Sequence, residues 1–235
     1  MKQNNRIIEA LLIACGLVAL GLSIKWGIDD FANKDRKVTV KGLAEKEVEA
    51  DKVTWPVSTK EIGNSLPDLY QKIGQTEAAI RRFLLQNGVK EDEINVNAPV
   101  VIDLNAERWG NTQNPYRYNI TSVMTVTSRN VKLVRSLIAR QGELLKDGIA
   151  IVDGGYENPI KYEYVSFQDM KPEMMEQAIT NAQKTAEQFA RNSNSRLNKI
   201  VNADQGQFSI DNRDENTPYI KKVRVVTTIT YSLKN

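Results

Sequence analysis

The chain contains no histidine, and its single cysteine, Cys15, lies inside an apolar N-terminal segment. The more polar remainder therefore offers neither an imidazole nor a thiol. This excludes Ser-His-Asp and Cys-His catalysis, the zinc, copper and iron sites built from those ligands, and an internal disulfide. We expect no catalytic residues, no cofactor and no metal, and a fold held by its core alone.

A strong charge of one sign is also missing. Residues 30–235 carry 29 Lys and Arg against 27 Asp and Glu, a net charge of +2, and no basic stripe stands out. A nucleic acid is therefore not an expected partner. With 41% apolar and 26% charged residues, the composition is that of a globular protein.

The N-terminal segment is the one long apolar run. Residues 7–28, taken as a helix, would extend about 33 Å, enough for a hydrocarbon layer of about 30 Å. We predict a signal anchor over residues 1–28 and a charged linker over 29–36. The anchor is expected to rest on its large apolar side chains: Leu11, Leu12, Ile13, Leu17, Val18, Leu20, Leu22, Ile24 and Trp26.

Two alternatives remain for this segment. Lys2 and Arg6 form a basic start that is also typical of a cleaved signal peptide, with small residues at Ala19–Gly21 or Gly21–Ser23. Residues 12–15 (LIAC) are similar to a lipoprotein motif that ends in an acylated cysteine. Basic residues lie on both sides of the apolar run, so charge alone does not fix its orientation.

Hydrophobic periodicity predicts an α+β fold with mainly antiparallel sheets and helices packed on one face. The helices expected are 64–87, about 130–146 and 172–191. The strands expected are 38–40, 53–57, near 94–104, 116–128, 160–167 and 223–233, with a charged turn or strand end at 45–49 and weakly extended chain at 197–210. Pro56 predicts an edge position or a bulge for its strand.

The predicted elements group into two small α+β subdomains after the anchor. The first is expected to combine residues 37–104 with about 205–235, and the second, ferredoxin-like, to cover about 105–204. The inner faces expected for the three helices are Leu66, Leu69, Ile73, Ile80, Phe83 and Leu84; Val131, Val134, Ile138 and Leu145; and Met175, Ala178, Ala182, Ala186 and Phe189.

Four stretches resemble the SIMPL-domain family. They are Val38–Gly42 followed by Ala50–Val53, Leu84–Ile94, Tyr116–Ser122, and the alanine-rich Ala178–Ala186. The resemblance covers nearly all of residues 37–235. It departs at Ala50, where the family often has proline, and at 192–198, which lack the usual glycines.

This resemblance implies an exported bacterial envelope protein with an α+β fold. Relatives include periplasmic immunogenic proteins; some members form large oligomers and some are linked to oxidative-stress tolerance. The family brings no established catalytic residues to carry over. We therefore expect a single-pass inner-membrane protein with a periplasmic soluble part, which forms a homo-oligomer or binds an envelope protein.

Polar segments supply the candidate sites. In the loop 105–116, Arg108, Trp109 and Tyr116 are candidate interaction residues, with Asn111 and Asn114 beside them; the alternative is a solvated loop. Asp211–Glu215 offers oxygen ligands for a hard cation but is better explained as a charged hairpin. Asp153–Gly155 is typical of a tight turn rather than of a phosphate nest.

A row of carboxylates, Glu45, Glu47, Glu49 and Asp51, allows a rival function. Facing carboxylates can hydrolyse glycans as an acid and base pair, although acids on a strand edge also discourage aggregation. The leading hypothesis is a non-enzymatic protein that self-associates or binds a partner through its β-rich surface. The rivals are a carboxylate-dependent hydrolase of envelope glycans and a periplasmic module that binds a small ligand.

Overall fold

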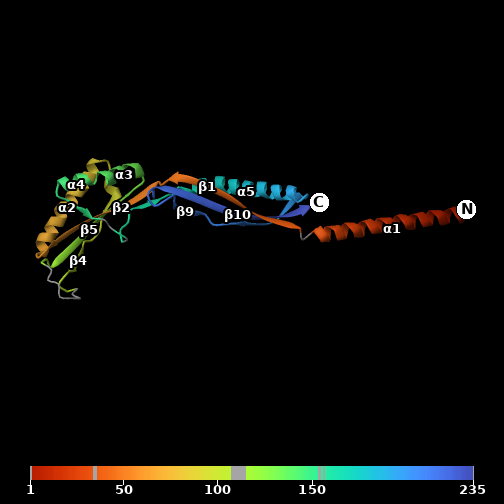
Figure 1. Ribbon diagram of the computed structural model, residues 1–235, viewed down its shortest axis with the longest axis horizontal. Coiled ribbons are helices and arrows are strands. Elements are labelled where there is room, and N and C mark those ends of the chain that lie inside the picture. Colours follow the sequence, from red (N-terminus) through yellow and green to blue (C-terminus); the bar gives the residue numbers. More distant parts are fainter. Residues whose placement is uncertain (1, 34–35, 107–114, 153–154, 156, 235) are drawn as a thin grey trace. The chain divides into compact units, whose positions relative to one another are not determined.

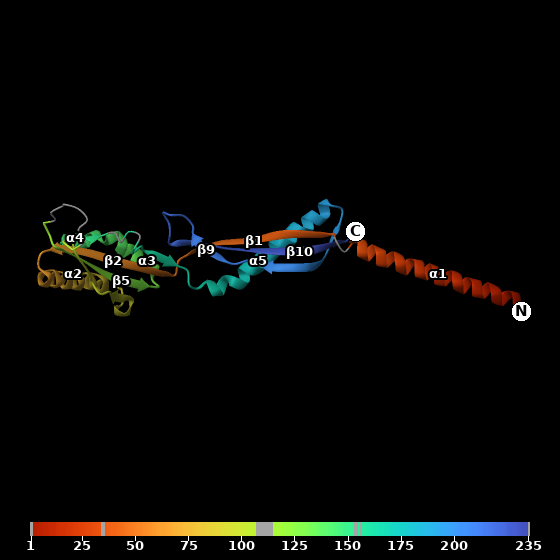
Figure 2. The same ribbon diagram turned by 90° about the horizontal axis from the view of Figure 1, so that it is seen from below.

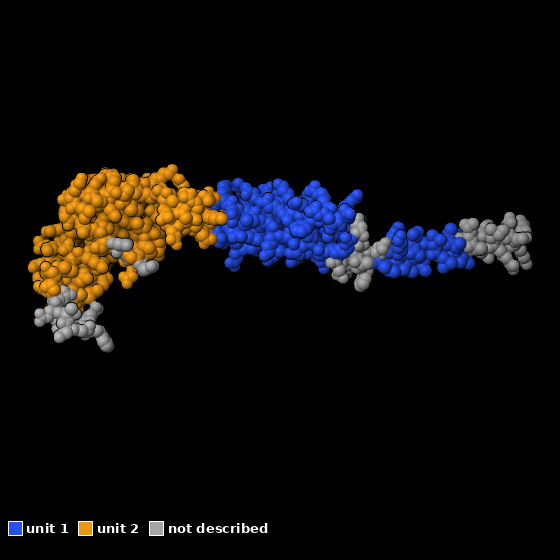
Figure 3. Space-filling view, viewed as in Figure 1, with its two compact units in different colours: residues 1–46, 170–209, 224–235 blue, residues 47–169, 210–223 orange. Residues whose placement is uncertain are grey.

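The fold was analysed in a computed structural model. It describes residues 2–33, 36–106, 115–152, 155 and 157–234, and in the first helix the side chains from Leu12 to Ile28. By contacts the chain divides into two compact units (Figure 3). Unit 1 comprises residues 1–46, 170–209 and 224–235, and unit 2 comprises residues 47–169 and 210–223.

The chain begins with one long helix, α1 (Lys2–Asn33). Every described side chain of α1 is exposed, including the large apolar side chains of Leu12, Leu17 and Ile24. Among the described residues, none of the helices is both long and apolar enough to pass through a membrane. The span predicted from the sequence starts at Ile7, before the first described side chain.

The sheet of unit 1 has the strand order β1-β10-β8, so the last strand in sequence lies in the middle. The strands are β1 (Lys37–Glu49), β8 (Arg196–Gln205) and β10 (Ile220–Lys234), and β9 (Ser209–Asn212) also pairs with β10. β8 and β10 run antiparallel, with Ile229 opposite Ala203 and Lys234 opposite Arg196. β1 and β10 have residues in both units.

Helix α5 (Phe167–Asn192) covers this sheet along β1 and β10 (Figure 1). Its buried side chains recur every four residues: Met170, Met174, Ala178, Ala182, Ala186 and Ala190. Ala182 and Ala186 pack with Val40, Ile229 and Tyr231 in one core cluster. The small side chains let helix and sheet approach closely, and Asn181 Nδ2 donates to the carbonyl oxygen of Leu43 at 2.9 Å.

Unit 2 contains a six-stranded antiparallel sheet. Its strands are β2 (Lys52–Gly63), β3 (Ile94–Val96), β4 (Val100–Asp103), β5 (Tyr118–Ser128), β6 (Ile151–Val152) and β7 (Lys161–Glu163). β2 pairs with β5 from Val53–Ser128 to Gly63–Tyr118. β3 and β4 pair with the other edge of β5, and β6 and β7 pair with the other edge of β2.

Helices cover one face of this sheet (Figure 1). They are α2 (Leu66–Gln86), α3 (Val131–Arg140) and the short α4 (Gly142–Lys146); a 3-10 helix, η1 (Glu91–Glu93), precedes β3. β3 and β4 together occupy one edge position of the sheet, and β6 and β7 together occupy the other. Counted this way, the chain order is β-α-β-β-α-β, which is the ferredoxin-like arrangement. The core joins Trp55 and Val57 of β2 to Ile80, Leu84 and Leu137 of the helices.

The subdomain boundaries differ from the sequence prediction. The ferredoxin-like arrangement lies within residues 47–169 of unit 2, not in 105–204. The reason is the eleven-residue pairing of β2 with β5, which joins residues 53–63 to 118–128 in one sheet. Conversely, α5 packs with β1, β8 and β10 in unit 1.

Several local predictions are also corrected. Helix α5 begins at Phe167, so Pro172 lies inside it. Residues 45–49, predicted as a charged turn or strand end, form the end of strand β1. The inner face of α5 carries Met174 and Ala190, whereas Phe189 is 58% exposed; in α4 the buried leucine is Leu144, and Leu145 is 61% exposed.

Strand β2 is central in its sheet and not an edge, contrary to the prediction from Pro56. On the side away from β5, β7 pairs with residues 52–54 and β6 with residues 58–59. Pro56 falls in the interval between these two partners. A residue without an N–H therefore costs no ladder hydrogen bond on that side.

Candidate functional site

Each carboxylate of the row from Glu45 to Asp51 has its own local partner. Glu45 lies 3.5 Å from Arg224, Glu47 lies 3.6 Å from Arg213, and Glu49 lies 3.4 Å from Lys132, all between charged nitrogen and oxygen atoms. The four carboxylates thus face different cations and backbone groups instead of one another. This arrangement gives no facing pair for acid and base catalysis among them.

Asp51 holds the chain segment that leads into α5. Its two carboxylate oxygens accept hydrogen bonds from the N–H groups of Val165, at 2.6 Å, and Ser166, at 2.8 Å. Burial alone would raise the pKa of Asp51, but the hydrogen bonds from Ser166 and Val165 together lower it below its ordinary value. Asp51 therefore holds, as an ionised carboxylate, the two residues just before Phe167, the first helical residue.

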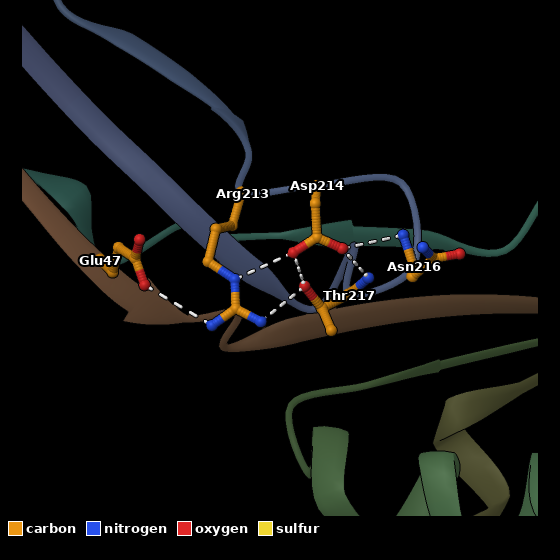
Figure 4. Close-up of polar contacts among 5 residues, drawn as sticks. All are labelled: Glu47, Arg213, Asp214, Asn216 and Thr217. Carbon is orange, nitrogen blue, oxygen red and sulfur yellow. Dashed lines mark hydrogen bonds and ion pairs between the residues drawn. The ribbon is translucent and has the colours of Figure 1, made fainter.

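The acidic segment 211–215 is part of a hairpin closed by its own side chains (Figure 4). Asp214 accepts hydrogen bonds from the N–H groups of Asn216 and Thr217, and from the side chains of Arg213 and Thr217. The Thr217 hydroxyl and the Arg213 guanidinium lower the pKa of Asp214 to about 2. The carboxylate that sequence analysis considered for a hard cation is thus used to shape a turn.

The described residues contain no group of three or more Asp, Glu or Cys side chains placed to hold a metal ion. Asn212, in the same hairpin, accepts a hydrogen bond from the amine of Lys221. Burial lowers the pKa of Lys221, while the nearby Glu163 and Asp211 raise it. The oxygen atoms of Asn212 and Asp214 therefore already face cations of the chain itself.

The predicted interaction loop lies mostly outside the described residues, which exclude Arg108, Trp109, Asn111 and Asn114. Tyr116 is described and 42% exposed. The base of the loop is closed by Arg117, which pairs with Asp103 at 3.0 Å, and by Asn64, which bonds Pro115 O and the Arg117 N–H. Of the predicted turn at 153–155, only Gly155 is described, and its φ of 56° suits glycine.

A second candidate surface is the sheet face of unit 2 opposite the helices. Side chains alternate along a strand, so Thr54, Pro56 and Ser58 of β2 share this face with Val123, Thr125 and Thr127 of β5. None of these six carries a charge. Lys52 and Lys60 continue the β2 row at its two ends, so on this strand charge flanks an uncharged centre.

This surface is here called the open face. Within the part of the chain that the structure describes, the Ser58 hydroxyl and the Asn119 side-chain oxygen have no hydrogen-bond partner, but both atoms are buried and therefore not presented to a binding partner. Pro56, Val123 and Thr125 are half-buried and belong to neither core cluster of unit 2. An uncharged sheet face of this kind is suited to contact with another macromolecule.

A comparison with protein families decides the relationship that the sequence motifs suggested. The family described as SIMPL, a protein of unknown function (DUF541), matches residues 38–231. The chain belongs to the SIMPL family. The matched region begins in β1 and ends in β10, so it takes in residues of both units.

The SIMPL match gives no activity, because the family description assigns none. A comparison with curated proteins finds no match. The open face and the carboxylate partners described above are therefore properties of this SIMPL chain, read from its own residues.

One cluster in the SIMPL domain, formed by Arg135, Tyr162 and Tyr219, was not predicted from the sequence. The Arg135 guanidinium of α3 lies 3.2 Å from the ring centre of Tyr219, and Tyr162 of β7 packs edge-on against the same ring at 6.2 Å. Burial raises the pKa of Tyr162, while the charge of Arg135 lowers it. The three residues are far apart in sequence and follow no spacing rule, so only the fold brings them together.

Proposed function

We propose that this protein is a non-enzymatic, membrane-anchored envelope protein that self-associates through the open face of unit 2. Helix α1 is the anchor, and the two units lie on the exported side of the inner membrane. The observation that carries the proposal is the uncharged sheet face centred on Thr125, which no described helix of unit 2 covers.

The support for the anchor is the nature of α1. Its described side chains are almost all apolar and all exposed, so the helix buries none of them within the chain. A helix that is apolar all round requires an apolar environment. Residues 7–28 are long enough to supply a span of about 33 Å.

The support for a binding role is the condition of the polar groups. The chain has no histidine, and its one cysteine lies in α1. The carboxylates from Glu45 to Asp51 each face a local partner, whereas the centre of the open face is uncharged and no described helix of unit 2 covers it. Self-association through a sheet face requires complementary shape and few charges that must be desolvated. The centre of the open face carries no charged side chain.

The test is the mass of the full chain in detergent, measured by light scattering over a range of concentrations. The wild type should have a protein mass of several times 26.5 kDa. Thr125→Lys places a charge at the centre of the open face and should reduce the mass to that of one chain. Gln71→Lys adds the same charge on the exposed side of α2 and should leave the assembly unchanged.

The proposal fails if the wild type is one chain at every concentration and chemical crosslinking in membranes recovers no second copy. If the crosslinks instead join the chain to a different envelope protein and Thr125→Lys abolishes them, the open face is a binding surface for that protein.

A further inference from the structure

One end of unit 1 brings together four segments of the chain. Lys234 of β10 pairs with Arg196 of β8, and the Leu233 N–H donates to the carbonyl oxygen of Arg36 at 2.9 Å. The Arg36 guanidinium donates to the Ser195 hydroxyl at 2.9 Å. Figures 1 and 2 show the C-terminal end of α5 at the same end of the sheet.

These segments are strongly basic. Residues 36–39, 187–199 and 231–234 contain one carboxylate, Glu187, and six cations, here called the basic end: Arg36, Lys37, Arg191, Arg196, Lys199 and Lys234. Five of the six are exposed, and Arg36 is half-buried. The ion pair of Arg191 with Glu187 is long, at 3.9 Å. Lys37, Arg196, Lys199 and Lys234 make no ion pair with a described residue.

The opposite end of unit 1 is balanced instead. Residues 44–46, 170–175, 204–209 and 224–226 contain three cations and three carboxylates. Two pairs are formed there, between Lys46 and Glu173 at 3.2 Å and between Arg224 and Glu45 at 3.5 Å. Between the two ends, Lys41, Lys184 and Glu176 add only one net positive charge, so most of the excess lies at the basic end.

The basic end is also the end attached to α1. The proposed span ends at Ile28, α1 continues for five residues, or about 7.5 Å, to Asn33, and the four steps from there to Lys37 span at most about 14 Å. The basic end is therefore tethered within about 21 Å of the end of the proposed span, which lets it reach the membrane surface. Unpaired Lys and Arg near a membrane are attracted to anionic headgroups over roughly one screening length, about 8–10 Å.

We propose that the basic end of unit 1 binds the headgroups of anionic phospholipids in the membrane that holds α1. This inference rests on the proposed anchor. The contact would hold unit 1 against the membrane surface through several exposed point charges, and it would weaken as salt rises.

The test is lysine acetylation of the full chain in nanodiscs, followed by mass spectrometry. One set of nanodiscs contains phosphatidylcholine alone, and the other also contains phosphatidylglycerol. In the anionic discs at low salt, Lys37, Lys199 and Lys234 should react at least about threefold more slowly, and high salt should restore their rates. The exposed Lys72 and Lys146 of unit 2 should react equally in both discs.

Two double variants test whether the protection depends on the cations of the basic end. Arg196→Gln with Lys199→Gln should reduce the protection of Lys37 and Lys234, whereas Lys72→Gln with Lys90→Gln should not. Equal acetylation in both kinds of disc, with the chain present in both, would overturn the lipid contact and leave the anchor standing. A chain that enters neither kind of disc would overturn the anchor and this inference with it.

Discussion

Gly42 of β1 lies directly against Ala182 of α5, and a Cβ atom at residue 42 would come 2.8 Å from the Ala182 Cβ and 2.6 Å from its backbone nitrogen. The same atom would overlap the carbonyl oxygen of Ala178. Helix and strand can approach this closely only because one has glycine and the other alanine at the contact. The glycine of the Val38–Gly42 motif and the alanines of α5 are thus both needed for the same close contact between strand and helix.

Gly42→Ala should destabilise the protein by about 1–3 kcal/mol, because the added methyl group meets helix backbone that cannot rotate away. Thermal unfolding and hydrogen exchange of the α5 amides would measure it. Gly74→Ala is the matched control: no atom lies within 4 Å of its added Cβ, so it should stabilise α2 by about 0.5–1 kcal/mol. Equal effects of the two changes would contradict the close contact.

Asp51→Asn should reduce stability at neutral pH by about 1–2 kcal/mol, because an amide oxygen is a weaker acceptor for the Val165 and Ser166 N–H groups. Chemical denaturation of the full chain would show it. Asp169→Asn removes the same charge from the first turn of α5 and should cost less, since no hydrogen bond of the Asp169 side chain is described.

The pH dependence of the same variant has a definite sign. The folded pKa of Asp51 lies below its unfolded value of about 3.9. Its contribution is therefore complete above that value and is lost as pH falls through the folded pKa. The stability difference between wild type and Asp51→Asn should shrink below about pH 4. A difference that stays constant in that range would show that the carboxylate charge is not involved.

Thr217→Val should raise the pKa of Asp214 from about 2 toward its ordinary value, because the hydroxyl is the largest cause of the lowering. Carbon-detected NMR titration of the carboxyl group would measure the change. Thr228→Val removes a hydroxyl of β10 remote from Asp214 in sequence and should leave that titration unchanged. An unaltered Asp214 titration in Thr217→Val would place the cause in Arg213 and the N–H groups of Thr217 and Asn216.

Arg135→Met should cost about 0.5–2 kcal/mol through loss of the contact with the Tyr219 ring. It should also raise the pKa of Tyr162 further, because the positive charge that now opposes the effect of burial is removed. NMR titration with labelled tyrosine would follow the second effect. Arg140→Met, which removes an exposed surface pair with Glu143, should cost less than Arg135→Met and leave the pKa of Tyr162 unchanged.

Sequence periodicity predicted those elements whose burial follows a simple rule. The strand predicted over 223–233 is confirmed as part of β10, in which Val223, Val225, Ile229 and Tyr231 alternate as buried residues. In α5 the buried residues are spaced strictly by four, which turns the stripe by about 40° at each step because a helix has 3.6 residues per turn. The sequence prediction used the usual mixed spacing of three and four residues. It therefore placed Phe189 on the buried face of α5, which is wrong.

Other differences arise from contacts that local sequence does not encode. Pro172 suggested a helix start, yet α5 begins five residues earlier, where Asp51 holds the amides of Val165 and Ser166. Pro56 suggested an edge, yet two short strands leave an interval beside it. The open face also had to be read from the register of β2 and β5, because the sequence does not show which side the helices cover.

The order of strands in unit 1 has a consequence for how the protein acquires its structure. β10 follows β1 and β8 in sequence, yet both of them pair with it, and Thr39 meets Thr230 across 191 residues of chain. Pairing over such separations is slow. During synthesis, the alanine face of α5 has no complete sheet to pack against until β10 has been made, so unit 1 is expected to stay unfolded, and accessible to chaperones, until then.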